Sequence, residues 1–84
     1  MLVILEAIRH LYKTCSTEQI EKTIEVLENF SEFRSIKEEE LDVVGELITN
    51  LCGALEVHGM VAQGMTEIEA ANAFSKKVLG SIDV

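Results

Sequence analysis

The stretch EEELDVVGELITNLCGALEVHGMVAQ, residues 38–63, decides the fold of this sequence. It opens on three glutamates, and negative charge is favourable at the start of a helix because of the helix dipole. It closes just before Gly64, a residue type suited to a left-handed cap at a helix end. No charged residue occurs from Leu47 to Leu55. We therefore predict one helix of about 27 residues, spanning about 40 Å.

Apolar side chains recur nearly all the way round this predicted helix, in two seams at helical spacing. One seam is Leu41, Val44, Ile48, Leu51, Leu55 and Ala62; the other is Val43, Leu47, Ala54, Val57 and Val61. A helix that is apolar on two faces needs cover on two faces. A domain of this length is on the order of 30 Å across. We therefore expect a second copy of the chain to cover part of the helix.

The residues expected at the interface between two copies are Leu47, Ile48, Leu51, Cys52 and Leu55. Gly53 lies among them, and an interior glycine costs a helix about 1 kcal/mol relative to alanine. Close approach of two backbones would compensate for that cost, so we expect the copies to cross near Gly53. The pattern leaves open which seam faces the second copy.

Two shorter helices are predicted before the long one. Over residues 2–13, Ile4, Ile8 and Leu11 share one face. The second helix, residues 17–31, follows a capping box formed by Ser16 and Gln19. Its apolar line is Ile20, Thr23, Ile24, Leu27 and Phe30, and its opposite side carries Glu18, Glu21, Glu25, Glu28 and Glu32.

Two further capping boxes are predicted. Residues 35–38 form one, which would open the long helix from Ser35. Thr66 and Glu69 form the other, which opens a last helix over residues 67–79 with Val78 facing inward and Gly80 at its end.

These patterns predict an all-α fold, a small bundle of four helices with a long central third helix. We expect the bundle to be dimeric, because the other three helices of one chain can cover only one seam of the long helix. One domain is expected over residues 1–84. The sequence contains no proline and only 5% aromatic residues. We expect a mainly aliphatic core whose large rings are Phe30, Phe33, Phe74 and Tyr12.

The formal net charge of −8 disfavours nucleic acid and anionic membrane surfaces as partners, since both repel an acidic protein. Most of the acidic residues serve solubility, and a basic protein partner is the alternative use for them. The amino-terminal run MLVIL is interrupted by Glu6 before it reaches the length of a signal-peptide core. We therefore expect a cytoplasmic protein.

No pattern of known chemistry is present in the sequence. A carboxylate-bridged metal bundle needs Glu-x-x-His pairs, which do not occur here, and no phosphate-binding loop is found. His10 and His58 are the two histidines, and His58 is interpreted as a hydrogen-bonded core or interface residue. We expect no metal, no cofactor and no enzymatic activity.

The two cysteines are Cys15 and Cys52, and they match no disulfide framework. We expect Cys52 to be shielded among Ile48, Leu51 and Leu55, and Cys15 to be the candidate reactive thiol in a polar turn. The leading functional hypothesis is a non-enzymatic, homodimeric interaction or accessory protein. The alternative is a thiol-linked redox accessory protein that uses Cys15 or Cys52.

From about Ile20 onward, the chain resembles a family of short bacterial proteins with no assigned function. The similarity is carried by residues 39–48 (EELDVVGELI), residues 53–58 (GALEVH) and the ending at residues 78–83 (VLGSID). It covers about three quarters of the chain. The resemblance implies an all-helical fold and supplies no catalytic residues.

Overall fold

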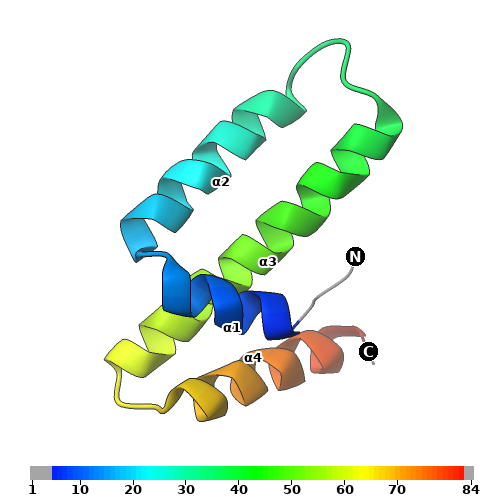
Figure 1. The fold of residues 1–84 in the computed structure, drawn as a ribbon. Helices are drawn as coiled ribbons and strands as arrows, with labels where there is room; N and C mark the ends of the chain where they lie inside the picture. The colour runs from blue at the N-terminus through cyan, green and yellow to red at the C-terminus, as the bar shows by residue number, and fades with distance from the viewer. Residues whose placement is uncertain (1–4, 83–84) are drawn as a thin grey trace.

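Four helices form the described part of the chain: α1 (Leu5–Thr14), α2 (Thr17–Ser31), α3 (Glu38–Ala62) and α4 (Glu67–Ile82) (Figure 1). The structure is a computed structural model, which describes the backbone of residues 5–82 and the side chains of residues 5–77. It confirms the all-α fold with a long central third helix. The 25 residues of α3 correspond to a length of about 38 Å.

The long helix α3 packs against all three of the other helices, whereas α2 packs, among the described helices, against α3 alone. Figure 1 shows α2 and α3 as an antiparallel pair that projects beyond α1 and α4. We call this projecting part, residues 17–50, the arm. The extents of the chain are 43 × 32 × 17 Å, with a radius of gyration of 13.5 Å. A compact chain of this length would have a radius of gyration of about 12 Å.

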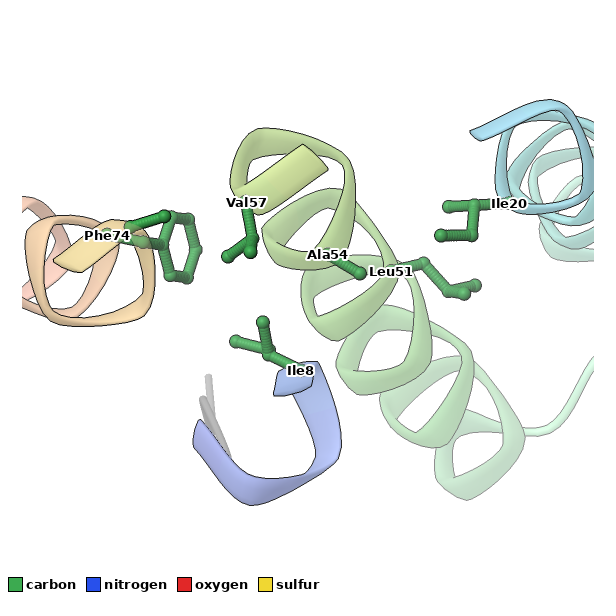
Figure 2. Packing of buried hydrophobic residues seen from close by; sticks show 7 residues of the cluster. Ile8, Ile20, Leu51, Ala54, Val57 and Phe74 are labelled. Atoms are coloured by element: carbon green, nitrogen blue, oxygen red, sulfur yellow. The ribbon is translucent and has the colours of Figure 1, made fainter. Parts of the chain in front are cut away.

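The core lies around the C-terminal half of α3. Figure 2 shows Ile20 near Leu51 on one side of that helix, and Ile8 and Phe74 near Val57 on another. The buried cluster comprises Ile8, Ile20, Leu51, Ala54, Val57, Ala70 and Phe74. Because Leu51 belongs to one predicted seam and Ala54 and Val57 to the other, both seams are covered here by helices of the same chain.

Gly53 lies beneath side chains of α1 and α4. A Cβ added at this position would lie 2.7 Å from Ile8 Cδ1 and 2.9 Å from Phe74 Cε2. The expectation that two copies cross near Gly53 is therefore wrong, because the close approach is made by helices of the same chain. Gly45, two turns earlier on α3, has no atom within 4 Å of an added Cβ.

Gly53→Ala and Gly45→Ala are expected to change stability in opposite directions. Both gain up to about 1 kcal/mol of helix propensity, but only Gly53→Ala forces a methyl group against the buried side chains of Ile8 and Phe74. Overpacking of this kind costs about 1–3 kcal/mol, so the two variants should differ by about that amount. Urea denaturation followed by circular dichroism measures the difference. Equal stabilisation of both variants would show that the crossing at Gly53 is looser than the structure describes.

Two helix starts follow their sequence signals. Before α2, the backbone N–H of Gln19 donates to Ser16 Oγ at 3.2 Å, and the backbone N–H of Ser16 donates to Gln19 Oε1 at 2.9 Å. Before α4, the backbone N–H of Glu69 donates to Thr66 Oγ1 at 3.1 Å, and that of Thr66 donates to Glu69 Oε1 at 3.0 Å. The same backbone hydrogen bond to the carboxylate lowers the pKa of Glu69. Both capping boxes are confirmed.

The end of α3 also confirms its prediction. Gly64 has a φ of 109°, a conformation that costs glycine little because it lacks a Cβ. Its N–H donates to the carbonyl of Val61 at 3.0 Å, and the N–H of Met65 donates to the carbonyl of Met60 at 3.1 Å. These two bonds form the Schellman motif that terminates many helices.

The predicted start of α3 is wrong. The helix begins at Glu38 after the N-cap Lys37, whose backbone N–H donates to Glu40 Oε1 at 3.0 Å. Ser35 lies one turn earlier, in a loop where the N–H of Ile36 donates to the carbonyl of Phe33 at 3.2 Å. The capping hydrogen bond therefore joins Lys37 and Glu40, instead of Ser35 and Glu38 as predicted.

The predicted end of the last helix is wrong as well. α4 continues through Gly80 to Ile82, since a glycine lowers helix stability by about 1 kcal/mol without stopping the helix. At the other end of the chain, α1 is described from Leu5. Two predictions lie outside what the structure describes: the helical conformation of residues 2–4 and the inward direction of the Val78 side chain.

Ion pairs join α1 to α4. Arg9 Nε lies 2.8 Å from Glu67 Oε1, and Lys13 Nζ lies 3.6 Å from the same oxygen. The hydrogen bond from Arg9 is the main cause that holds the pKa of Glu67 below its ordinary value. The stabilisation from this pair is therefore present at neutral pH and is lost as the pH falls through the lowered pKa.

Candidate functional site

The N-terminal half of α3 has less cover than its C-terminal half. Figure 1 shows α1 and α4 lying across the C-terminal half, so that α2 is the helix beside the N-terminal half. As a result, Leu41 is 44%, Val43 54% and Leu47 48% exposed. The two predicted seams are thus buried at one end of α3 and open at the other.

An open groove of about 710 Å³ lies where α1, α2 and the exposed half of α3 meet. Its apolar walls are Ala7 and Leu11 of α1, Leu27 of α2, and Val43, Leu47 and Leu51 of α3. Polar side chains complete the lining, namely Glu6, His10, Thr23, Glu46 and Asn50. The groove therefore combines an apolar interior with two carboxylates and no lysine or arginine among its described lining residues.

Apolar surface continues from the groove along the arm. A second hollow, of about 370 Å³, is lined by Phe30, Glu39, Glu40, Val43 and Val44, so that Val43 belongs to both hollows. The ring of Phe30 in turn stacks on that of Phe33, with centroids 6.5 Å apart. We call the continuous surface formed by Leu27, Phe30, Phe33, Val43 and Leu47 the apolar strip. Isolated exposed apolar residues are common on monomers, but a contiguous strip typically marks an interaction site.

The predicted interface residues are not all on this surface. Leu47 and Leu51 both line the groove, but Leu51 is only 8% exposed and belongs to the core. Ile48 and Leu55 are half-buried, and Cys52 is exposed without lining the groove. Of these five predicted interface residues, Leu47 is the one that belongs to the strip, and it is about half exposed.

Phe30 and Phe33 are the residues that the sequence reasoning missed. They are 41% and 56% exposed, so their expected place in the core is wrong, whereas Phe74 is buried and Tyr12 is half-buried. Phe33 lies in the turn after α2, next to Arg34. Phe33 continues no apolar pattern of helical spacing, and its neighbour in the sequence is a cation. These two features of the sequence indicated that its ring is exposed.

Cys52 is exposed, whereas Cys15 is half-buried. The expectation that Cys52 is shielded among neighbouring apolar residues is therefore wrong, because its position points about 100° around the helix from Leu51. Partial burial of the sulfur raises the pKa of Cys52, and the negative charges of Glu28 and Glu56 raise it further. An accessible thiol is thus kept in its less reactive, protonated form.

Glu28→Gln is expected to accelerate alkylation of Cys52. The thiolate is the nucleophile, and the raised pKa of Cys52 leaves less thiolate near pH 8 than an ordinary thiol has. Replacing Glu28 removes one of the charges that raise this pKa, so the rate near pH 8 should increase. Rates of iodoacetamide labelling from pH 6.5 to 10, resolved by peptide mass spectrometry, measure the effect. Glu25→Gln makes the same charge change one turn away, and equal rates in both variants would contradict the role of Glu28.

Cys15 stays the candidate reactive thiol, which the structure places at the corner between α1 and α2. Its Sγ lies 3.6 Å from Thr14 Oγ1. Its carbonyl lies 2.9 Å from His58 Nε2, and since a carbonyl only accepts hydrogen bonds, Nε2 must carry the proton. The ring of Tyr12 lies 4.5 Å from that of His58. The predicted hydrogen bond of His58 is confirmed, and its side chain is half-buried beside the core rather than part of it.

The described residues provide neither a metal-binding cluster nor a membrane-crossing helix. No group of three or more His, Cys, Asp or Glu side chains there is placed to hold a metal ion. None of the described helices has both the length and the apolar run that crossing a membrane requires.

The model of a family described as "Family of unknown function (DUF6952)" matches residues 4–83. Neither the curated proteins nor the solved structures give a match.

Proposed function

The chain belongs to this family of unknown function, and we propose that it is a non-enzymatic interaction protein that works as a homodimer. The observation that supports the proposal is the apolar strip on the arm. Val43 and Leu47 are about half exposed and line an open groove. Phe33 is also about half exposed and joins the strip by stacking on Phe30. A second copy would remove this strip from water on both chains at once.

The surface area is consistent with this proposal. The accessible surface of the chain is 5981 Å², whereas a compact monomer of this mass exposes about 5,000 Å². The difference is close to the area of about 800 Å² that each partner contributes to a standard interface. The chain as a whole therefore exposes more surface than a compact monomer of its mass, by an amount of the size that an interface buries.

The energies are of the size that dimerisation requires. Burying the exposed half of a large apolar side chain contributes roughly 1 kcal/mol. Five strip residues on each of two copies would contribute roughly 10 kcal/mol, against an association cost of about 4–15 kcal/mol. Apolar burial and the cost of association are thus comparable, so that the polar contacts at the rim decide how tight the dimer is.

We further propose a basic protein as the partner of the dimer. Glu18, Glu21 and Glu25 of α2 are exposed, as is Glu32 at its C-cap. Among them Glu18 has a lysine nearby, with Lys22 Nζ at 3.6 Å. None of these glutamates lines the groove, so they stay accessible when the strip is covered. A cytoplasmic location, proposed from the sequence, suits such a role.

The redox alternative has weaker support. A thiol that exchanges rapidly at neutral pH needs substantial thiolate character, and the pKa of Cys52 is raised rather than lowered. Cys15 is half-buried, and its backbone carbonyl is held by His58. Self-association through the strip is therefore the function that we propose first.

The thermal midpoint of the wild-type chain is expected to rise with protein concentration. Dimerisation stabilises the folded state by mass action, and a tenfold increase in concentration should raise the midpoint by about 3–5 °C. Circular dichroism melts between 2 and about 200 µM measure this shift. A midpoint that is constant over that range would contradict the homodimer.

A further inference from the structure

The turn at the end of the arm, residues 30–37, carries two exposed rings, two cations and one exposed carboxylate, that of Glu32. Phe30 and Phe33 stack on each other, and Arg34 and Lys37 beside them are exposed. Hydrogen bonds from the N–H of Phe33 to the carbonyl of Phe30 (3.0 Å) and from the N–H of Ile36 to the carbonyl of Phe33 (3.2 Å) close the turn. We call these residues the tip. Its backbone and its two stacked rings are ordered before any partner binds, which lowers the entropic cost of binding.

The groove is the chemical complement of the tip. Its walls are apolar, with Leu27 and Leu47 among them, and its lining includes the carboxylates of Glu6 and Glu46. Aromatic rings would displace water from the apolar walls, while a guanidinium or ammonium group would face the carboxylates. The tip supplies both kinds of group within a few residues of each other.

The positions of tip and groove on the arm suit a two-fold axis. Lys37, the N-cap of α3, and Leu47 are ten residues apart, which corresponds to about 15 Å along a helix. Val43 lies near the midpoint, in the hollow that it shares with Phe30. A two-fold axis beside Val43 would place two arms antiparallel, with the tip of each copy over the groove of the other. In such an interface every contact is made twice.

We propose that two copies of the chain exchange tips in this way. Phe33 of each copy enters the groove of the other, and Arg34 and Lys37 face Glu6 and Glu46 across the interface. This arrangement rests on the proposed homodimer and specifies its geometry. Val43 meets its own counterpart at the axis, and Leu47 meets Phe33.

Charge favours this arrangement over others that bury the same strip. Each chain has a net charge of −8, so an interface that brought two acidic surfaces together would be repulsive. Lys22, Arg34 and Lys37 are the cations between residues 18 and 46, and two of these three belong to the tip. When the tip lies on the groove, Arg34 and Lys37 are attracted to the carboxylates of Glu6 and Glu46. This attraction offsets part of the repulsion between the two acidic copies.

Charge reversal tests the proposed contacts without removing apolar surface. Arg34→Glu and Glu46→Arg should each weaken dimerisation by about tenfold, because each change makes two repulsive contacts per dimer. The double variant exchanges the charges and should recover most of the wild-type affinity. Lys76→Glu, at an exposed position on α4, alters net charge as Arg34→Glu does and should leave the affinity within about twofold. Sedimentation equilibrium at fixed ionic strength provides the dissociation constants.

Disulfide cross-linking tests the proposed geometry independently. In a chain with Cys15→Ala and Cys52→Ala, verified as folded by circular dichroism, Phe33→Cys and Leu47→Cys are introduced separately. Mild oxidation of the mixed variants should join position 33 of one copy to position 47 of the other. Oxidation of either variant alone should give little product, since the two-fold axis separates like positions.

The outcomes distinguish this inference from the homodimer itself. Cross-linking between positions 33 and 47, together with recovery in the charge-exchanged double variant, supports the exchange of tips. A wild-type dimer that is insensitive to Arg34→Glu and cross-links mainly through identical positions would overturn the exchange of tips and leave the homodimer standing. A monomeric wild type would overturn both.

Discussion

Leu51→Glu is expected to leave the chain unfolded or aggregated. Leu51 is 8% exposed and packs in the core with Ile8 and Ile20. Losing a buried leucine costs about 2–5 kcal/mol, and burying a carboxylate without a partner adds several more. A domain of this length is typically stable by about 4–13 kcal/mol in total. Far-ultraviolet circular dichroism at 25 °C should show that most of the helical signal is lost.

The matched control for Leu51→Glu is Leu51→Met, which keeps an apolar side chain of similar volume. A swap of this kind usually costs less than about 1.5 kcal/mol, so this variant should stay folded. A helical and cooperatively unfolding Leu51→Glu chain would mean that Leu51 reaches water. The core around the C-terminal half of α3 would then be described incorrectly.

Leu47→Glu, one helical turn before Leu51, is expected to give a folded monomer. Leu47 is 48% exposed, so a carboxylate there reaches water in the single chain and the helix content should be unchanged. In the dimer, the same carboxylate would be buried against apolar surface on both copies. A loss of about 2 kcal/mol at each of two symmetric sites weakens dimerisation by roughly 1,000-fold. Sedimentation velocity and circular dichroism on the same sample separate association from folding.

Ile68→Glu provides the control for this second variant. Ile68 is 60% exposed in the first turn of α4, outside the strip and the groove, and a glutamate there suits the start of a helix. The variant should remain a dimer. Loss of dimerisation in both variants, or in neither, would show that the apolar strip is not the specific interface.

The ends of the helices were predictable where the signal was local. The pairs formed by Ser16 with Gln19 and by Thr66 with Glu69 make their hydrogen bonds within four residues, so that sequence spacing alone identifies them. Gly64 ends α3 for an equally local reason, its positive φ. The start of α3 was not predictable in this way, because several residues near position 37 could serve as the cap.

The division of α3 into a buried and an open half depended on tertiary structure. Val43 and Val57 lie on the same predicted seam, yet Val57 is fully buried and Val43 is 54% exposed. The difference arises because α1 and α4 cross one half of α3 only (Figure 1). Sequence periodicity records which side of a helix is apolar and contains no information on where a crossing helix ends.

The same limit applies to the candidate site. A stretch with two apolar seams indicated a surface in need of cover, and Leu47 is on that surface. Gly53 was misassigned because a small residue indicates close approach without identifying the approaching helix, which here belongs to the same chain. The tip was missed because the contact of Phe30 with Phe33 forms across the end of α2, where helical periodicity stops.

The central claim is that the apolar strip joins two copies of this chain. Multi-angle light scattering on the wild-type protein after gel filtration, at low micromolar concentration, tests it most directly. The chain has a mass of 9.3 kDa, and we predict a single species of twice that mass. A well-folded species of 9.3 kDa at the same concentration would contradict the claim, because Val43, Leu47 and Phe33 would then face water in the working protein.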